Sequence, residues 1–214
     1  MSRRDVASRN TAWAARVAKW LAQRGVTPNS ISIASIVFAA MAGVCLFLSG
    51  RVELGLPRAA CFLGAILGIQ LRLLCNLFDG MVAVEHDRRT KSGEIFNELP
   101  DRFSDLFIIA GAAYSDPLAP WLLHLGWVAA TLAVKTAYIR ALGASAGAGQ
   151  HFLGPMAKQH RMAVMTLCCL IQMGLGFIDQ PFAILTWGLG VMIVGELVTI
   201  VRRTWAVVRT LEAT

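Results

Sequence analysis

Carboxylate and amide side chains recur at helical spacing in two neighbouring stretches of the chain. In the first stretch, polar and small residues share one helix face, namely Arg72, Asn76, Asp79, Gly80 and Ala83. The second stretch repeats this spacing with Gly93, Glu94, Asn97, Asp101 and Asp105. Two antiparallel helices would bring these oxygen ligands together at one depth, and hard oxygen ligands favour Mg²⁺ or a similar ion over zinc. The pattern therefore predicts a divalent-metal site between two helices.

A purely structural interpretation of the same residues is also open. Asp101 and Asp105 could pair with Arg72 and Arg102 and only stabilise the two helices. That interpretation does not explain the small residues that accompany the carboxylates, which are Gly80, Ala83 and Gly93. Small side chains leave room beside the ligands, as a bound phosphate group would require. Charged groups within or near a membrane span are costly unless paired, hydrated or metal-bound, so we treat them as functional candidates.

The elements that must position these residues are membrane spans. Hydrophobic residues make up 56% of the 214 residues, and the mean hydropathy of +0.58 is high for a soluble globule. Six apolar stretches approach the length of about 20 residues that a bilayer requires, and they cover 31–48, 57–84, 95–114, 118–142, 162–178 and 182–201. The sequence predicts an all-α integral membrane protein with six transmembrane helices; a soluble protein with a large core is the disfavoured alternative.

Basic residues alternate between the connections that join these spans. The net charge of +7 would suggest a nucleic-acid partner in a soluble protein. Here the charges cluster before the first span and after the second, fourth and sixth spans, at Arg3, Arg4, Arg9, Arg16, Lys19, Arg24, Arg88, Arg89, Lys91, Lys158, Arg161, Arg202, Arg203 and Arg209. This distribution follows the positive-inside rule. We therefore expect both termini in the cytoplasm and no nucleic-acid partner.

An amphipathic helix is expected before the first span, at about residues 10–24. Trp13, Val17, Trp20 and Leu21 share one face, which is typical of a helix lying at the membrane surface; a simple linker is the alternative. The predicted organisation is a cytoplasmic N-terminus with this interfacial helix (1–29), a six-helix membrane domain (30–204) and a cytoplasmic tail (205–214). Within the second span, a G-x-x-x-G step at 64–68 permits close helix approach.

The two polar stretches resemble the signature of the CDP-alcohol phosphatidyltransferases. That signature is D-x-x-D-G-x-x-A-R, followed after eight residues by G-x-x-x-D-x-x-x-D. This chain has N-L-F-D-G-M-V-A-V at 76–84 and G-E-I-F-N-E-L-P-D at 93–101, with the same spacing throughout. Further similarities are Thr90, the Thr27-Pro28-Asn29 step, and Tyr138-Ile139-Arg140 followed by a small-residue loop and Lys158-Gln159-His160-Arg161.

The resemblance implies phospholipid biosynthesis in a bacterial inner membrane by a homodimer. The implied reaction transfers a phosphatidyl group from CDP-diacylglycerol to an alcohol and releases CMP. It implies that Mg²⁺ or Mn²⁺ is held by Asn76, Asp79, Asn97 and Asp101, with Asp101 as the general base. The residues implied to bind the donor are Pro28, Asn29, Gly80, Ala83, Thr90 and Gly93.

The resemblance also implies that Arg140, Lys158 and Arg161 face the acceptor. Three cations would suit a phosphorylated alcohol such as glycerol phosphate or inositol phosphate. Ordinary positive-inside charge explains the same three residues equally well.

Three departures from the family pattern qualify these expectations. Asn76 and Asn97 replace the first and third aspartates, and Val84 replaces the arginine. Two fewer negative charges should weaken metal binding, although Glu94 or Asp105 could restore one. His86, Arg88 or Arg89 could substitute for the missing arginine.

These departures indicate a divergent branch of the family and leave three other functions open. The first is an enzyme of the same class with a different acceptor or donor. The second is a catalytically silent relative that binds the nucleotide-lipid. The third is a small membrane transporter, which is disfavoured because the polar residues cluster at the cytoplasmic ends of the spans.

Overall fold

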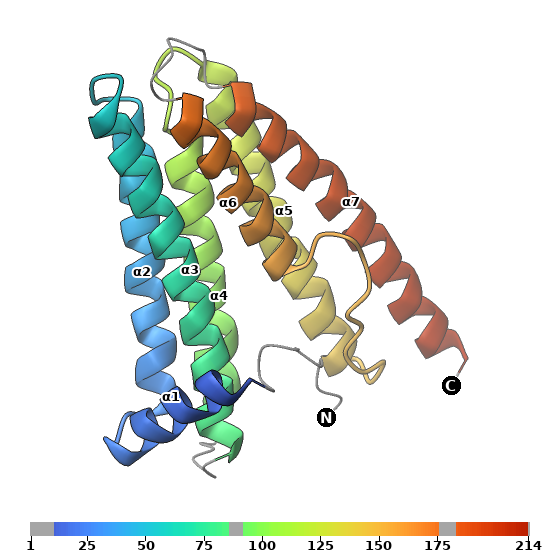
Figure 1. The fold of residues 1–214 in the computed structure, drawn as a ribbon. Coiled ribbons are helices and arrows are strands. Elements are labelled where there is room, and N and C mark those ends of the chain that lie inside the picture. Colours follow the sequence, from blue (N-terminus) through green and yellow to red (C-terminus); the bar gives the residue numbers. More distant parts are fainter. Residues whose placement is uncertain (1–10, 86–91, 176–182, 214) are drawn as a thin grey trace.

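The computed structural model describes residues 11–85, 92–175 and 183–213. All regular structure in these ranges is helical, and the seven helices form an elongated bundle (Figure 1). They are α1 (Ala12–Gln23), α2 (Pro28–Ser49), α3 (Leu56–Glu85), α4 (Gly93–Ala113), α5 (Pro120–Ser145), α6 (Lys158–Leu175) and α7 (Ala183–Glu212).

Four of these helices, α2, α3, α5 and α7, are long and apolar enough to cross a membrane. The chain is therefore an all-helical membrane protein. Helices α4 and α6 run alongside the four in the bundle (Figure 1), but they are more polar, and α4 carries the charged residues of the second polar stretch. The count of six spans stays a prediction.

The sequence around Thr27 explains where α2 begins. The Thr27 side chain accepts a hydrogen bond from the backbone N–H of Ser30 at 3.2 Å, and Pro28 occupies the first helical turn. Helix α3 has 30 residues, or about 45 Å at 1.5 Å per residue. Because a bilayer core is about 30 Å thick, one end of α3 extends beyond it. Helix α7 also has 30 residues, so the predicted tail continues as helix through Glu212.

Glycines let the first helices pack with their backbones nearly touching. A Cβ placed on Gly111 of α4 would lie 2.3 Å from the carbonyl oxygen of Gly43 on α2. Similarly, a Cβ on Gly68 would meet the carbonyl oxygen of Phe38 at 2.7 Å, and one on Gly64 would meet the sulfur of Cys45. The G-x-x-x-G step therefore packs α3 against α2 within the chain.

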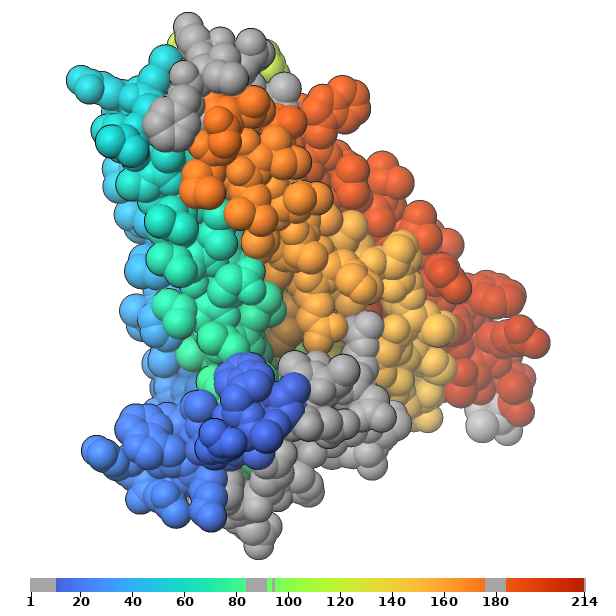
Figure 2. All heavy atoms as spheres, in the orientation of Figure 1, coloured from blue at the N-terminus to red at the C-terminus, as the bar shows by residue number. Residues whose placement is uncertain are grey.

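Helix α1 lies across one end of α3, as Figures 1 and 2 show. Three alanines spaced four apart, Ala14, Ala18 and Ala22, are buried against Met81 and Val82 of α3. The ring of Trp13 packs edge-on against Phe78, with 6.0 Å between the centroids. Trp13 and Trp20 are otherwise exposed, as an interfacial helix requires.

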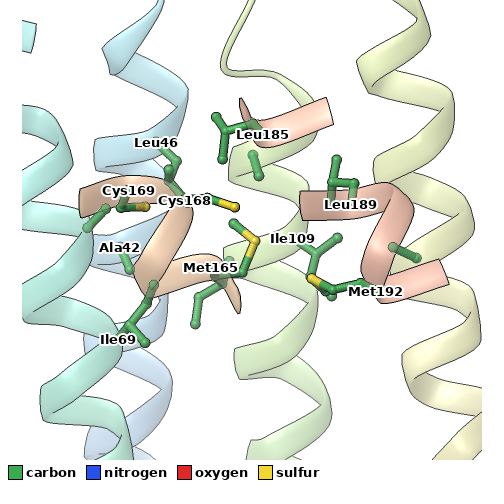
Figure 3. Packing of buried hydrophobic residues seen from close by; sticks show 14 of the residues in the cluster. Ala42, Leu46, Ile69, Ile109, Met165, Cys168, Cys169, Leu185, Leu189 and Met192 are labelled. Atoms are coloured by element: carbon green, nitrogen blue, oxygen red, sulfur yellow. The ribbon is translucent and has the colours of Figure 1, made fainter. Parts of the chain in front are cut away.

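The apolar core fills the middle of the bundle. Figure 3 shows Ala42 and Leu46 of α2 near Ile69 of α3, with Met165 of α6 and Leu189 of α7 on the other side. This packing connects α2–α4 to α5–α7. The polar residues of interest lie between this core and the end of the bundle covered by α1.

Candidate functional site

The two signature aspartates of this chain are buried on adjacent helices at the same end of the bundle. Asp79 of α3 and Asp101 of α4 are only 5% and 4% exposed, and the charges of Asp101 and of Lys158 on α6 both act on the Asp79 carboxylate. The three side chains form what we call the shallow cluster. Both carboxylates therefore point into the protein and away from the lipid.

Cations surround both oxygens of Asp101. Its Oδ2 lies 2.5 Å from the Lys158 ammonium and 3.8 Å from Arg102, while its Oδ1 lies 3.3 Å from Arg72. Lys158 belongs to the first turn of α6, so this contact joins α4 to α6. Its side chain is 26% exposed, which leaves the cluster accessible from that side.

Asp79 is oriented from the start of α2. The Ser32 hydroxyl donates a 2.6 Å hydrogen bond to Oδ2 of Asp79. On α3, one turn before Asp79, the amide nitrogen of Asn76 donates to the carbonyl oxygen of Arg72 at 3.1 Å. The amide oxygen of Asn76 is thus the atom available to a cation. Asn97 is exposed near the start of α4.

A second set of charges lies one helical turn further along α4. Asp105 is fully buried, with one oxygen 2.9 Å from Arg72 and the other 2.5 Å from Arg161. Arg161 also lies 3.7 Å from the buried Glu196 of α7. We call Arg72, Asp105, Arg161 and Glu196 the deep cluster. It joins four helices, and its pairing offsets the high cost of removing charges from water.

The structural interpretation of the polar stretches thus applies to Asp105. Each of its oxygens is held by a buried arginine, whereas Oδ2 of Asp101 is held by the partly exposed Lys158. Asp105 is therefore the less available of the two carboxylates for a metal ion. Arg72 contacts Asp101 as well as Asp105, so the two clusters are coupled through one guanidinium.

The three cations expected at the acceptor lie in three different environments. Lys158 is in the shallow cluster and Arg161 is in the deep cluster. Arg140 of α5 lies at the rim, where it contacts both carboxylate oxygens of Glu98 at 2.5 Å and its guanidinium lies 5.3 Å from the Phe152 ring centroid. Of the three, only Lys158 contacts a signature aspartate.

The expected donor residues lie near the same end of the bundle. Pro28 and Asn29 open α2, Gly80 adjoins Asp79, Ala83 is one turn further along α3, and Gly93 opens α4. Thr90 lies outside the described residues, as do His86, Arg88, Arg89 and the side chain of Glu94.

Sequence reasoning missed several polar residues that shape these clusters. Ser32 gives no signal of its own, although it follows the Pro28 step by one turn. Glu196 had a clear signal, because a lone carboxylate in the apolar last span is expensive unless it is paired. Arg203 donates to the carbonyl oxygens of Thr136 and Leu153 at 2.6 and 2.9 Å. In the sequence this residue signals only the positive-inside pattern.

The donor set suits one divalent ion better than a larger metal centre. Over the described ranges, no three His, Cys, Asp or Glu side chains are grouped closely enough to hold a metal ion. What the site offers is Asp79, Asp101 and amide oxygen. These hard oxygens match Mg²⁺ or Mn²⁺ in type, but the Lys158 ammonium already contacts one of them.

Comparison with known proteins gives consistent matches. The family model described as CDP-alcohol phosphatidyltransferase matches residues 25–201. The chain is 32% identical over 87 residues to inner membrane protein YnbA of Escherichia coli (strain K12), a match that spans only 40% of that relative's length and 41% of this chain. It is 25% identical over 205 residues to phosphatidylinositol phosphate synthase of Mycolicibacterium smegmatis, covering 89% of this chain and 82% of the relative.

Solved structures share the fold. A crystal structure of Mycobacterium tuberculosis phosphatidylinositol phosphate synthase (PgsA1) with CDP-DAG bound superposes with a TM-score of 0.74 at 19% identity, covering 91% of this chain and 92% of that one. The same enzyme in complex with manganese and citrate gives a TM-score of 0.73 at 18% identity, covering 91% and 88%.

Proposed function

The chain belongs to the CDP-alcohol phosphatidyltransferase family, and on that premise we propose that it transfers a phosphatidyl group from CDP-diacylglycerol to an alcohol, releasing CMP. The observation that carries this proposal is the placement of two buried carboxylates, Asp79 and Asp101, on adjacent helices, with the partly exposed Lys158 in contact with Asp101. Such a cluster supplies a proton acceptor beside a cation, which a phosphoryl transfer requires.

In the proposed reaction, Asp101 is the general base. Its carboxylate accepts the proton of the acceptor hydroxyl, whose oxygen attacks the phosphorus that carries the diacylglycerol group. The bond from this phosphorus to the bridging oxygen breaks, and that oxygen leaves with CMP. Asp79, oriented by the hydrogen bond from Ser32, fixes negative charge beside the reacting groups. Preorganised charges of this kind stabilise the transition state because they need not reorient.

A divalent cation completes the proposed site. Asn76, Asp79, Asn97 and Asp101 would hold Mg²⁺ or Mn²⁺, which would neutralise the pyrophosphate of the donor. The PgsA1 structure with manganese supports this choice by analogy of fold. The nucleotide-lipid would lie against the small or backbone-exposing residues at this end of the bundle, which are Pro28, Asn29, Gly80, Ala83, Thr90 and Gly93.

A phosphorylated alcohol is the acceptor class we propose. Lys158 of α6 contacts Asp101, and Arg140 of α5 pairs with Glu98, which lies one turn earlier on α4. Arg161 is paired with Asp105, one turn further along α4. A phosphate group would compete with Glu98 for Arg140 and with Asp101 for Lys158. The relative named for phosphatidylinositol phosphate synthesis supports inositol phosphate as a candidate, with glycerol phosphate as the other.

We further propose that the protein is a homodimer of a bacterial inner membrane with both termini in the cytoplasm. The relative YnbA is an inner membrane protein, and the positive-inside pattern of the connections supports a cytoplasmic position for the shallow cluster. Asn76, Asn97 and Val84 would mark a divergent branch with an acceptor of its own.

The test is release of CMP by the purified protein. CDP-diacylglycerol would be supplied in mixed micelles with Mg²⁺ or Mn²⁺ and each of a panel of alcohols, including glycerol phosphate and inositol phosphate. We expect CMP release with one class of acceptor only. Binding of CDP-diacylglycerol without CMP release from any acceptor would favour the catalytically silent alternative.

A further inference from the structure

Lys158 occupies an unusual position for a residue of a metal-binding cluster. Its ammonium nitrogen lies 2.5 Å from Oδ2 of Asp101, and its charge also acts on Asp79. Asp79 and Asp101 are the two carboxylates that this chain keeps where the family pattern has four. A protein cation therefore already sits among the oxygens that a divalent ion would need.

The charge balance of the site follows from this contact. Two carboxylates and one ammonium leave a single net negative charge in the shallow cluster, and Arg72 and Arg102 add further positive charge around Asp101. A divalent ion placed between Asp79 and Asp101 would meet the Lys158 ammonium at short range. Repulsion between like charges is strong where burial lowers the local dielectric constant.

We propose that Lys158 is a built-in cation that competes with the divalent ion for Asp79 and Asp101. The inference rests on the proposed function only in taking these two carboxylates as the reactive site. In this arrangement, Asn76 and Asn97 remove two negative charges from the site, and the nearby ammonium of Lys158 adds a positive one. The site consequently binds divalent metal weakly, and binding requires the ammonium to move away from Asp101.

The position of Lys158 makes this movement feasible. It is the first residue of α6, and its side chain is 26% exposed. A lysine side chain has four rotatable carbon–carbon bonds and can carry its ammonium into water. Arg161, one turn further along α6, cannot do the same because it is buried between Asp105 and Glu196.

Equilibrium binding of Mn²⁺, measured by the loss of the free-ion EPR signal, tests the proposal without any turnover. The full-length protein in detergent would be compared with Lys158→Met, Lys158→Arg and the control Lys135→Met, which removes an exposed lysine on α5. We expect Lys158→Met to bind Mn²⁺ about tenfold more tightly than the wild type, while the other two variants bind as weakly as the wild type. Equal or weaker binding by Lys158→Met overturns the proposal.

A second measurement uses the wild type alone and stays valid if Lys158→Met does not fold. Reaction of Lys158 with an amine-selective reagent would be followed by mass spectrometry while Mn²⁺ is raised. Displacement of the ammonium by the metal should speed the labelling of Lys158 at least about threefold relative to Lys135. An unchanged labelling ratio at saturating Mn²⁺ would contradict the competition. Neither measurement depends on CMP release, so a failed transferase assay and a failed competition are distinct outcomes.

Discussion

The shallow and deep clusters contain the same kinds of residue about one helical turn apart, yet they are built differently. In the deep cluster each oxygen of Asp105 has its own arginine and every side chain is excluded from solvent. In the shallow cluster Asp101 is held by a flexible, partly exposed lysine and by two more distant arginines. Access and the rigidity of the partner thus distinguish Asp101, the carboxylate proposed to react, from Asp105, which holds helices together.

The largest effect should come from removing the proposed base. Asp101→Asn keeps the shape of the side chain but replaces one carboxylate oxygen by an NH2 group and cannot accept the hydroxyl proton, so CMP release should fall about 10³-fold. Thermal unfolding in detergent should remain cooperative. Asp116→Asn, in the loop between α4 and α5, is the control and should keep full activity. Activity within tenfold of the wild type would refute the assignment of Asp101 as base.

Breaking the deep cluster should cost stability. Arg161→Met leaves Asp105 and Glu196 buried with fewer cations, and such a change typically costs about 3–5 kcal/mol. The free energy of unfolding, measured by denaturant titration in micelles, should fall accordingly. Arg140→Met breaks the more exposed ion pair with Glu98 and should cost about 1 kcal/mol or less. Equal losses of unfolding free energy in the two variants would show that the deep cluster stabilises the protein no more than the Arg140–Glu98 pair does.

The hydrogen bond from Ser32 links α2 to the shallow cluster. Ser32→Ala should lower CMP release about tenfold because Asp79 loses a charge-assisted hydrogen bond of about 1.5–3 kcal/mol. Ser35→Ala is a matched control, since Ser35 is also buried on α2 but donates only to the backbone of Ser32. If both variants keep wild-type rates, the orientation of Asp79 does not depend on Ser32.

The smallest effect concerns the exposed edge of the site. Asn97→Asp adds a negative charge near the proposed metal position, so half-maximal activity should need about fivefold less Mg²⁺. Gln23→Glu on α1 adds the same charge on an exposed surface and should leave the Mg²⁺ titration unchanged. A higher Mg²⁺ requirement in Asn97→Asp would show that the amide is not a ligand.

The sequence predicted much of the helix pattern because long apolar runs have few alternatives to spanning a membrane. The run at 31–48 became α2, extended to Pro28 by the Thr27 cap. The last run at 182–201 falls in α7, which continues beyond it to Glu212 on a mixture of arginines and apolar residues. Likewise Lys158 and Arg161, expected in a connection, lie in the first turn of α6.

The spacing of the signature also indicated that Asp79 and Asp101 share a site, because each lies on the polar face of its helix. It could not indicate which cation meets which carboxylate. The pairing of Lys158 with Asp101 and of Arg161 with Asp105 depends on how α6 is rotated about its axis. That rotation is set by packing around Met165 and Cys169 in the core, and no local pattern in the sequence encodes it.

Helices α2 and α4 pack tightly against each other, because Gly43 and Gly111 meet with no side chain between them. Neither helix can slide past the other without forcing a side chain against the neighbouring backbone, so we expect larger motions on the opposite side of the bundle, at α6. We expect amides near the start of α6 to exchange with deuterium faster than those around Gly43 and Gly111. A substrate would then enter by displacing the start of α6.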